Sequence, residues 1–262
     1  MQDYLALAKS LATQAGVIMR DNFVLDIDKE WKADQTPLTI ADTSINDLVI
    51  AEVEKHFPDH GVLGEERSVG TDREYLWVVD PVDGTMPYSH GLPASTFSIA
   101  LVKDGQPIVA VVEDPFCNRQ YAAIKGEGTF LNGKTRLHVN AQTKLEPKVF
   151  VDIAAWPKFN GFSAAKTYAA LVDRGAHASK SFSAIFNALP VITGQHAGSI
   201  VFLDFPWDGA ALALLVTEAG GKISDLHGTE RRWDKSGDGF IVSNGLVHQE
   251  IVDILAATRD AQ

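Results

Sequence analysis

The apolar run Tyr75–Val79 ends abruptly at an acidic residue and a proline, Asp80-Pro81, and this boundary strongly constrains the fold. A short run of large apolar residues that stops in this way is typical of a buried β-strand. Carboxylates avoid the ends of buried strands unless they are paired or bind a metal ion. The chain is therefore expected to build a buried sheet with functional carboxylates at one edge.

The spacing of apolar residues divides the chain into two halves. Residues 3–22 and about 42–55 show the three- and four-residue spacing of amphipathic helices. An antiparallel meander is predicted from strand-like runs separated by turn residues, at 75–79, 96–102, 108–112 and 120–124. Strands and helices then alternate, with strands at 149–153, 199–202 and 240–242 and helices at 162–173, 183–193, 208–219 and 246–257.

These patterns predict a chain that is α+β in its first half and α/β in its second. We expect residues 1–145 to form an α+β subdomain with most of the acidic motifs, and residues 146–262 an α/β subdomain with the Trp-Asp motif. No linker-like segment separates the two parts. The halves are therefore expected to pack as one compact catalytic unit.

Composition excludes several classes of function. The 262 residues carry 23 Lys and Arg against 34 Asp and Glu, a formal charge of −11, which argues against a general binder of nucleic acid or of anionic membranes. The single cysteine, Cys117, excludes an intrachain disulfide and a cysteine-based zinc site. The sequence shows neither a signal-peptide pattern at its N-terminus nor an apolar stretch of ~18–20 residues. We expect a cytoplasmic protein without a membrane or nucleic-acid partner.

The segment Asp80–Thr85 has the composition of a metal and phosphate site. Asp80 and Asp83 can turn toward one point, and the carbonyl of Val82 between them could supply a third hard oxygen of the kind that Mg²⁺ prefers. Gly84-Thr85 then offers backbone N–H groups to a phosphate and one hydroxyl to a water. Taken alone, the segment could equally be a strand followed by a capped turn. An EF-hand is excluded, because Val82 stands where its loop needs an oxygen ligand.

Further acidic residues lie at turns beside apolar runs. Glu65 and Glu66 follow one such run and, taken alone, could form a solvated turn. Asp208 precedes an apolar helix and could simply be its N-cap or an acid of its first turn. Asp42 lies at the start of the second predicted helix. Only the combination of these acids in one order favours a shared site.

The ordered set of motifs resembles the inositol monophosphatase family, over about residues 5 to 245. The motifs that carry the resemblance are Lys32–Asp42, Gly64–Glu66, Asp80–Thr85, Lys125–Gly133, Trp207–Ala210 and Glu218–Asp225. The resemblance implies a layered α-β-α-β-α sandwich of the inositol monophosphatase and fructose bisphosphatase type. It also implies a Mg²⁺-dependent, lithium-sensitive phosphomonoesterase that forms a homodimer.

The same resemblance assigns roles to the acidic residues. Glu65, Asp80 and the Val82 carbonyl would hold one Mg²⁺, and Asp80, Asp83 and Asp208 would hold a second. Glu65 would assist a weaker third ion through water, so that two or three ions serve one site.

The remaining roles in the resemblance concern water and substrate. Thr85 and Asp42, with Glu65, would orient and deprotonate the attacking water. The backbone N–H groups of Gly84 and Thr85, together with Asp83, would bind the substrate. Hydrolysis of a phosphate dianion needs cations that neutralise its oxygens and lower the pKa of water, which is consistent with a carboxylate cluster that binds metal.

The substrate expected from the resemblance is a small phosphomonoester, with inositol 1-phosphate as the first choice. Histidinol phosphate, fructose 1,6-bisphosphate and 3′-phosphoadenosine 5′-phosphate are alternatives that the same metal core could serve. A regulatory binding protein that retains the fold is an alternative of another class. A structural Ca²⁺ protein is a third, which Gly84-Thr85 at the edge of the site disfavours.

Three segments depart from the family pattern. Met86–His90 replaces an Asn or charged residue followed by an aromatic, and Ser181–Ala184 stands where a Gly-Ser pair is usual. Val201 lies seven residues before Asp208, where inositol-selective members carry a glutamate that binds sugar hydroxyls. A valine cannot form hydrogen bonds with a polyol, so we expect weaker or redirected selectivity with intact metal chemistry.

Overall fold

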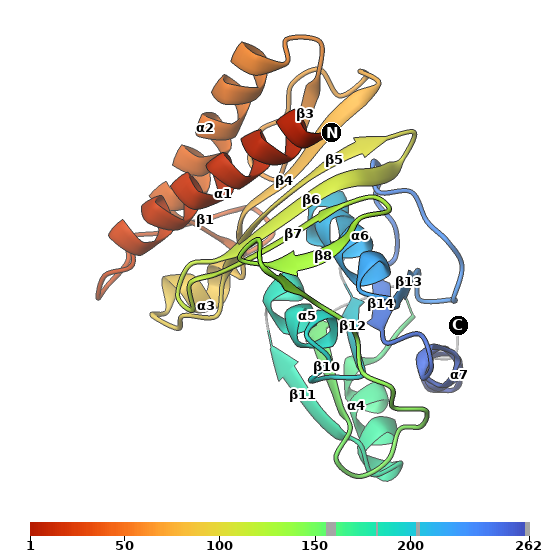
Figure 1. The fold of residues 1–262 in the computed structure, drawn as a ribbon. Coiled ribbons are helices and arrows are strands. Elements are labelled where there is room, and N and C mark those ends of the chain that lie inside the picture. The colour runs from red at the N-terminus through yellow and green to blue at the C-terminus, as the bar shows by residue number, and fades with distance from the viewer. Residues whose placement is uncertain (156–160, 182, 203–204, 260–262) are drawn as a thin grey trace.

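Alternating layers of helix and sheet, in the order α-β-α-β-α, make up the part of the chain that the structure describes (Figure 1). The structure is a computed structural model that describes residues 1–155, 161–181, 183–202 and 205–259. This architecture confirms the predicted layered sandwich. Each layer buries an apolar face against the next, which gives the three large hydrophobic clusters of the molecule.

The first half of the chain builds a seven-stranded sheet. Its strands, in spatial order, are β3 (Gly61–Gly64), β4 (Tyr75–Asp83), β5 (Thr96–Lys103), β6 (Gln106–Asp114), β7 (Arg119–Ile124), β8 (Gly128–Leu131) and β9 (Thr135–Arg136). All neighbours are antiparallel except β3, which runs parallel to β4. The predicted meander is confirmed. Strands β3, β8 and β9 were not predicted, because they are too short to show a clear alternation.

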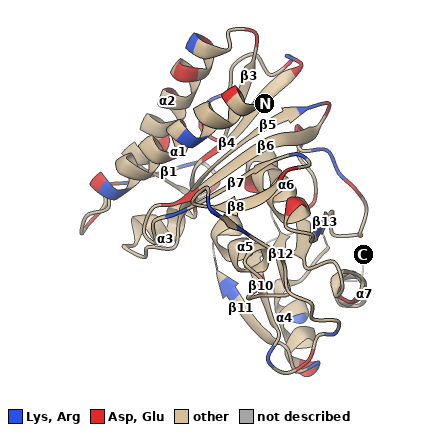
Figure 2. Ribbon diagram, in the orientation of Figure 1, with Lys and Arg blue, Asp and Glu red and all other residues tan. Residues whose placement is uncertain are grey.

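Two predicted helices, α1 (Gln2–Asp21) and α2 (Ile40–His56), cover the outer face of this sheet. The buried stripe of α1 includes Leu11, Ala15 and Met19, which share one hydrophobic cluster with Trp77 of β4. Acidic and basic residues lie along the same two helices, as expected of amphipathic helices with one exposed face (Figure 2). A two-stranded hairpin, β1 (Glu30–Trp31) and β2 (Pro37–Leu38), connects them.

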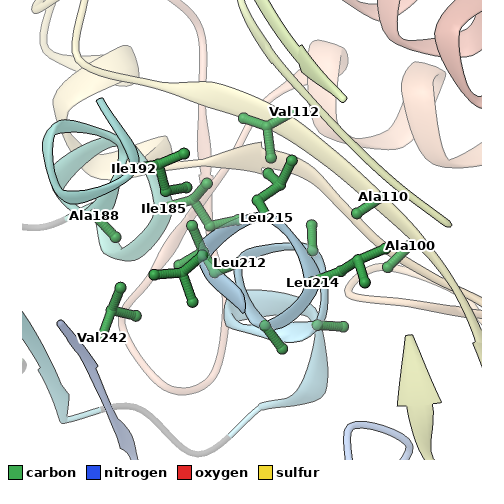
Figure 3. Close-up of a cluster of buried hydrophobic side chains, with 14 of the residues drawn as sticks. Ala100, Ala110, Val112, Ile185, Ala188, Ile192, Leu212, Leu214, Leu215 and Val242 are labelled. Atoms are coloured by element: carbon green, nitrogen blue, oxygen red, sulfur yellow. The ribbon is translucent and has the colours of Figure 1, made fainter. Parts of the chain in front are cut away.

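The middle layer consists of α5 (Ala184–Ile192) and α6 (Ala210–Glu218), which lie between the two sheets (Figure 1). In α6, every residue from Ala210 to Val216 is buried, because the helix contacts sheet on both sides. Figure 3 shows how this layer joins the halves, with side chains of both helices close to those of both sheets; the labelled residues are Ile185, Ala188, Ile192, Leu212, Leu214 and Leu215 in the helices and Ala100, Ala110, Val112 and Val242 in the sheets.

The second half builds a five-stranded sheet in the order β11-β10-β12-β14-β13. The strands are β10 (Phe150–Ala155), β11 (His177–Ser181), β12 (Gly198–Phe202), β13 (Lys222–Ser224) and β14 (Phe240–Ser243), and α4 (Ala164–Asp173) and α7 (His248–Thr258) cover the outer face. Strand β10 is parallel to both of its neighbours, and β14 is antiparallel to both of its own. The predicted helices and strands of this half are confirmed, whereas β11 and β13 were missed.

The predicted division at residue 145 falls between β9 and β10. One hydrophobic cluster includes residues from both halves, such as Val112 of β6 and Val242 of β14. We keep the division into two subdomains as a proposal. Within the described residues, no helix combines the length and apolar character needed to cross a membrane.

Candidate metal centre and active site

Three buried carboxylates meet where β4 ends and where a short 3₁₀ helix, η1 (Pro206–Asp208), leads into α6. They belong to Asp80 and Asp83 of β4 and to Asp208 of η1. One carboxylate oxygen from each residue lies within 4.8 Å of the others. The three residues are 2%, 3% and 7% exposed in that order. The structure thus brings together three of the sequence-predicted metal ligands.

A β-bulge explains how one strand presents two of these acids to one point. Asp80 pairs with Ser98 of β5 and Asp83 with Thr96, so three residues advance along β4 where two advance along β5. Side chains three positions apart in a regular strand would lie on opposite faces. The extra residue in β4 corrects this alternation. Pro81, which lacks an N–H group to donate to the ladder, lies in this irregular stretch.

The charges of these carboxylates oppose one another. Burial raises the pKa of Asp80 well above its ordinary value, and the charges of Glu65 and Asp83 raise it further. Burial also raises the pKa of Asp208, with the same two neighbours adding to the effect. In addition, Oδ2 of Asp208 is buried and has no hydrogen-bond partner among the described residues. Hard anionic oxygens in this arrangement fit a divalent cation such as Mg²⁺.

Asp83 differs from the other two acids because the start of α5 supplies donors to it. Backbone N–H groups of the first turn donate to its carboxylate, from Ala184 at 2.9 Å, Ile185 at 3.1 Å and Phe186 at 3.0 Å. The hydroxyl of Ser183 also donates to Asp83, and that of Thr96 does so at 3.2 Å. Burial raises the pKa of Asp83, and the hydrogen bonds from Ser183 and α5 oppose that rise. The second half of the chain therefore positions a carboxylate of the first half.

Thr85 and Asp42 also lie together, as the sequence predicted. The Thr85 hydroxyl lies 3.1 Å from Oδ1 of Asp42 and 2.9 Å from the carbonyl oxygen of Val82, and it can donate its single proton to either. Oδ2 of Asp42 accepts from the backbone N–H and the hydroxyl of Thr39, in the capping box that begins α2. Burial raises the pKa of Asp42 to about 6, although the hydrogen bonds from Thr39 oppose the rise. A carboxylate with such a pKa can accept a proton near neutral pH.

Glu65 is the residue that directly follows β3. Among the described residues it lies outside the group of three carboxylates, yet its charge contributes to the raised pKa of Asp80. Its Oε1 lies 2.9 Å from the ammonium group of Lys32, which also contacts Glu66 at 2.5 Å. Sequence reasoning noted Lys32 only as part of a motif and gave it no role. Its position after an exposed strand gave no signal of this contact.

The turn after Asp83 requires glycine. Gly84 has φ of +79°, and an added Cβ would lie 2.9 Å from both the carbonyl oxygen of Ala94 and Cβ of Ser183. The hydroxyl of Ser95 donates to the carbonyl of Gly84 at 2.9 Å. This turn leads directly into α3 (Thr85–Ser89), which follows the site.

The segments that depart from the family pattern have separate outcomes. Val201 is fully buried in the central hydrophobic cluster, so it offers no polar group to a substrate. Of the segment 181–184, Phe182 lies outside the described residues, while Ser183 holds Asp83 as described above. Sequence reasoning missed this role of Ser183. A serine directly before an apolar helix was a signal for an N-cap, but nothing in the sequence indicated that Asp83 would lie there.

Comparisons with known proteins support the fold and the family resemblance. Residues 1–261 match the inositol monophosphatase family. The chain is 33% identical over 218 residues to a fructose-1,6-bisphosphatase/inositol-1-monophosphatase of Thermotoga maritima, covering 83% of this chain and 82% of that one. It is 32% identical over 270 residues to a histidinol-phosphatase of Mycobacterium tuberculosis, covering 97% and 98%. A solved IMPase/NADP phosphatase, in complex with Mg²⁺ and phosphate, superposes with a TM-score of 0.87 at 26% identity, covering 100% and 98%.

Proposed function

Since this chain belongs to the inositol monophosphatase family, a family of metal-dependent phosphatases, we propose that it hydrolyses a small phosphate monoester with water activated by Mg²⁺. The observation that carries the proposal is the group of three buried carboxylates of Asp80, Asp83 and Asp208. Their raised pKa values and the unpartnered oxygen of Asp208 favour a cation as their common partner.

We assign two or three Mg²⁺ ions to this site. Glu65, Asp80 and the Val82 carbonyl would hold one ion, and Asp80, Asp83 and Asp208 a second, with Glu65 near a third. Bound Mg²⁺ neutralises phosphate oxygens, lowers the pKa of water and stabilises the leaving alkoxide. The ammonium group of Lys32 lies 2.9 Å from Oε1 of Glu65, so this carboxylate already has a cationic partner at the edge of the site.

The chain's own groups then orient and deprotonate the water. The Thr85 hydroxyl, when it donates to Asp42, leaves lone pairs that can accept from a water molecule. Asp42 is the proposed acceptor of the proton, consistent with its pKa of about 6. The N–H groups of Gly84 and Thr85 are the proposed contacts to phosphate oxygens, in a turn that excludes a larger residue at Gly84.

Inositol 1-phosphate, the family default, is the first substrate to test. Histidinol phosphate is a second candidate, because the histidinol-phosphatase relative matches 97% of this chain and because Val201 offers no hydrogen bond to a polyol. We also propose a cytoplasmic homodimer that is inhibited by lithium, on the family resemblance alone.

Phosphate release from a panel of monoesters tests the proposal, measured with Mg²⁺ and with EDTA. The panel includes inositol 1-phosphate, histidinol phosphate, fructose 1,6-bisphosphate and 3′-phosphoadenosine 5′-phosphate. Mg²⁺-dependent turnover that the substitution Asp83→Asn abolishes would support it. Asp225→Asn is the matched control, because Asp225 caps a turn between β13 and β14 and should leave turnover unchanged. A protein that binds Mg²⁺ yet hydrolyses no ester would instead be a regulatory binding protein.

A further inference from the structure

Two aromatic rings stand beside the metal centre and have no role in the chemistry above. Phe205 and Trp207, on either side of Pro206, stack with ring centroids 4.9 Å apart and an interplanar angle of 6°. Trp207 packs against the central hydrophobic cluster, which fixes its position. Phe205 lies over it and is 43% exposed. A rigid base thus supports an aromatic ring that still contacts solvent.

The backbone connects this ring directly to the metal centre. Phe205 directly precedes the helix η1, three residues before Asp208. Three residues in a 3₁₀ helix span roughly 6 Å, from a rise of about 2 Å per residue. The backbone of Phe205 therefore lies close to that of Asp208, one of the three clustered carboxylates.

The residue types that precede Asp208 favour stacking over polar recognition. Val201, at the position where inositol-selective members carry a glutamate, is 0% exposed and belongs to the hydrophobic cluster on which Trp207 packs. A polyol needs fixed hydrogen-bond partners, whereas a flat ring needs a flat apolar surface. Among the described residues, Phe205 offers a flat apolar surface, whereas Val201 offers no hydrogen bond to a polyol.

We propose that Phe205, supported by Trp207, selects phosphate monoesters whose alcohol carries a flat aromatic ring, over esters of saturated alcohols and polyols. This inference rests on the proposed function and names the substrate class of the same site. The ring of the substrate stacks on Phe205 while the phosphate lies at the carboxylates. Stacking of this kind is expected to favour an aromatic ester by about 3- to 10-fold.

A matched pair of esters tests the proposal: 2-phenylethyl phosphate and 2-cyclohexylethyl phosphate, which differ chiefly in the flatness of the ring. The ratio of their kcat/KM values is the readout. The wild-type ratio is expected to be about 3 to 10 in favour of the aromatic ester. Phe205→Leu keeps an apolar side chain but should reduce the ratio to about 1, whereas Phe205→Tyr should retain it.

Phe150→Leu is the matched control variant. Phe150 is 44% exposed and stacks on His177 and His196 at the beginning of β10, so it resembles Phe205 in exposure and ring contacts. Its substitution should leave the ratio unchanged. A wild-type ratio near 1, or a ratio that Phe205→Leu does not alter, would overturn the proposal, and Phe205 would then only shield Trp207 from water.

Binding of the two corresponding phosphonates in Mg²⁺, measured by calorimetry, separates this proposal from the proposed function. If neither ester is hydrolysed, the phosphatase proposal fails. A 3- to 10-fold tighter binding of the phenyl phosphonate, lost in Phe205→Leu, would still support aromatic stacking on Phe205. If both esters are hydrolysed and both phosphonates bind equally, only the proposed stacking on Phe205 is refuted.

Discussion

The metal centre and the second sheet each bury an aspartate, but they satisfy it in different ways. Asp152 of β10 is 6% exposed, and both of its oxygens have protein partners, since Ser179 donates to Oδ1 and His196 Nδ1 lies 2.5 Å from Oδ2. Asp208 is 7% exposed and has one buried oxygen without a partner among the described residues. Both aspartates are buried, so burial does not distinguish them. The oxygen without a hydrogen-bond partner marks Asp208 as the carboxylate that can bind a cation, whereas Asp152 stabilises the fold.

The largest expected effect follows from removing one charge from the metal centre. Asp208→Asn keeps the size of the side chain but removes its negative charge, which weakens the proposed cation site. We expect kcat/KM to fall by about 10³-fold, a loss of roughly 4 kcal/mol in transition-state stabilisation. In EDTA the same variant should unfold at a higher temperature than the wild type, because a repulsive buried charge is gone. Steady-state kinetics and a thermal melt in EDTA check both parts, and a lower melting temperature would contradict the comparison.

Mg²⁺ should stabilise the wild-type protein through the same residues. At a concentration 100 times the dissociation constant, binding to the folded state contributes about 2.7 kcal/mol. The gain should be absent from Asp208→Asn and present in Asp152→Asn. Chemical denaturation at several Mg²⁺ concentrations measures it, and an equal gain in all three proteins would place the cation elsewhere.

Asp152→Asn should show the opposite behaviour to Asp208→Asn. The amide replaces one of two acceptor oxygens with a donor and weakens the contacts with Ser179 and His196, so we expect a loss of about 1–3 kcal/mol in the free energy of unfolding. Activity at saturating Mg²⁺ should not change. A stability loss combined with unchanged kcat/KM confirms that this acid is structural. A decrease in kcat/KM larger than the decrease in the folded fraction would contradict a purely structural role for Asp152.

His248 allows a smaller test of the same idea in a neutral cluster. The imidazole is 1% exposed, and its ring nitrogens lie 2.8 Å from the hydroxyls of Ser224 and Ser243. Burial lowers the pKa of His248 to about 4, with the nearby charge of Lys222 adding to the effect. As the pH falls, His248 therefore binds a proton in the unfolded chain near its ordinary pKa of 6.5, before it does so in the folded protein. The stability from a neutral His248 is fully present above that value and is lost as the pH falls toward 4.

Between pH 7 and pH 5 this loss should amount to about 2 kcal/mol. The measurement is the free energy of unfolding at both pH values for wild type and for His248→Gln. The difference between the two pH values should be about 2 kcal/mol smaller in the variant. Equal pH dependence in both proteins would show that the unfolded and folded states bind this proton alike.

The sequence was informative where an acidic residue interrupts an apolar pattern. Asp80, Asp83 and Asp208 each stand at the boundary of a buried element, and the structure brings all three together. Periodic elements such as α1 and β5 predicted the α+β and α/β halves, whereas the layered order came from the family resemblance. The roles of the three aspartates as metal ligands remain predictions.

What the sequence did not predict depends on contacts between distant segments. Strand β11 reads His-Ala-Ser-Lys-Ser, without an apolar alternation, because it is an edge strand that pairs on one side only. The bonds of Ser183 and the first turn of α5 to Asp83 exist only because the middle layer packs against the end of β4. Lys32 pairs with Glu65, from which β2, α2 and β3 separate it along the chain, so no local pattern predicts the contact.

The division of the site between both ends of the chain has a consequence for protein synthesis. The ribosome releases the N-terminal part of the chain first, and that part can begin to fold before synthesis is complete. The acidic end of β4 would then lack both the donors of α5 at Asp83 and the third carboxylate, Asp208. The nascent chain therefore carries buried negative charge without these partners until translation has passed residue 208, and the proposed ion shared by Asp80, Asp83 and Asp208 could bind only after that point.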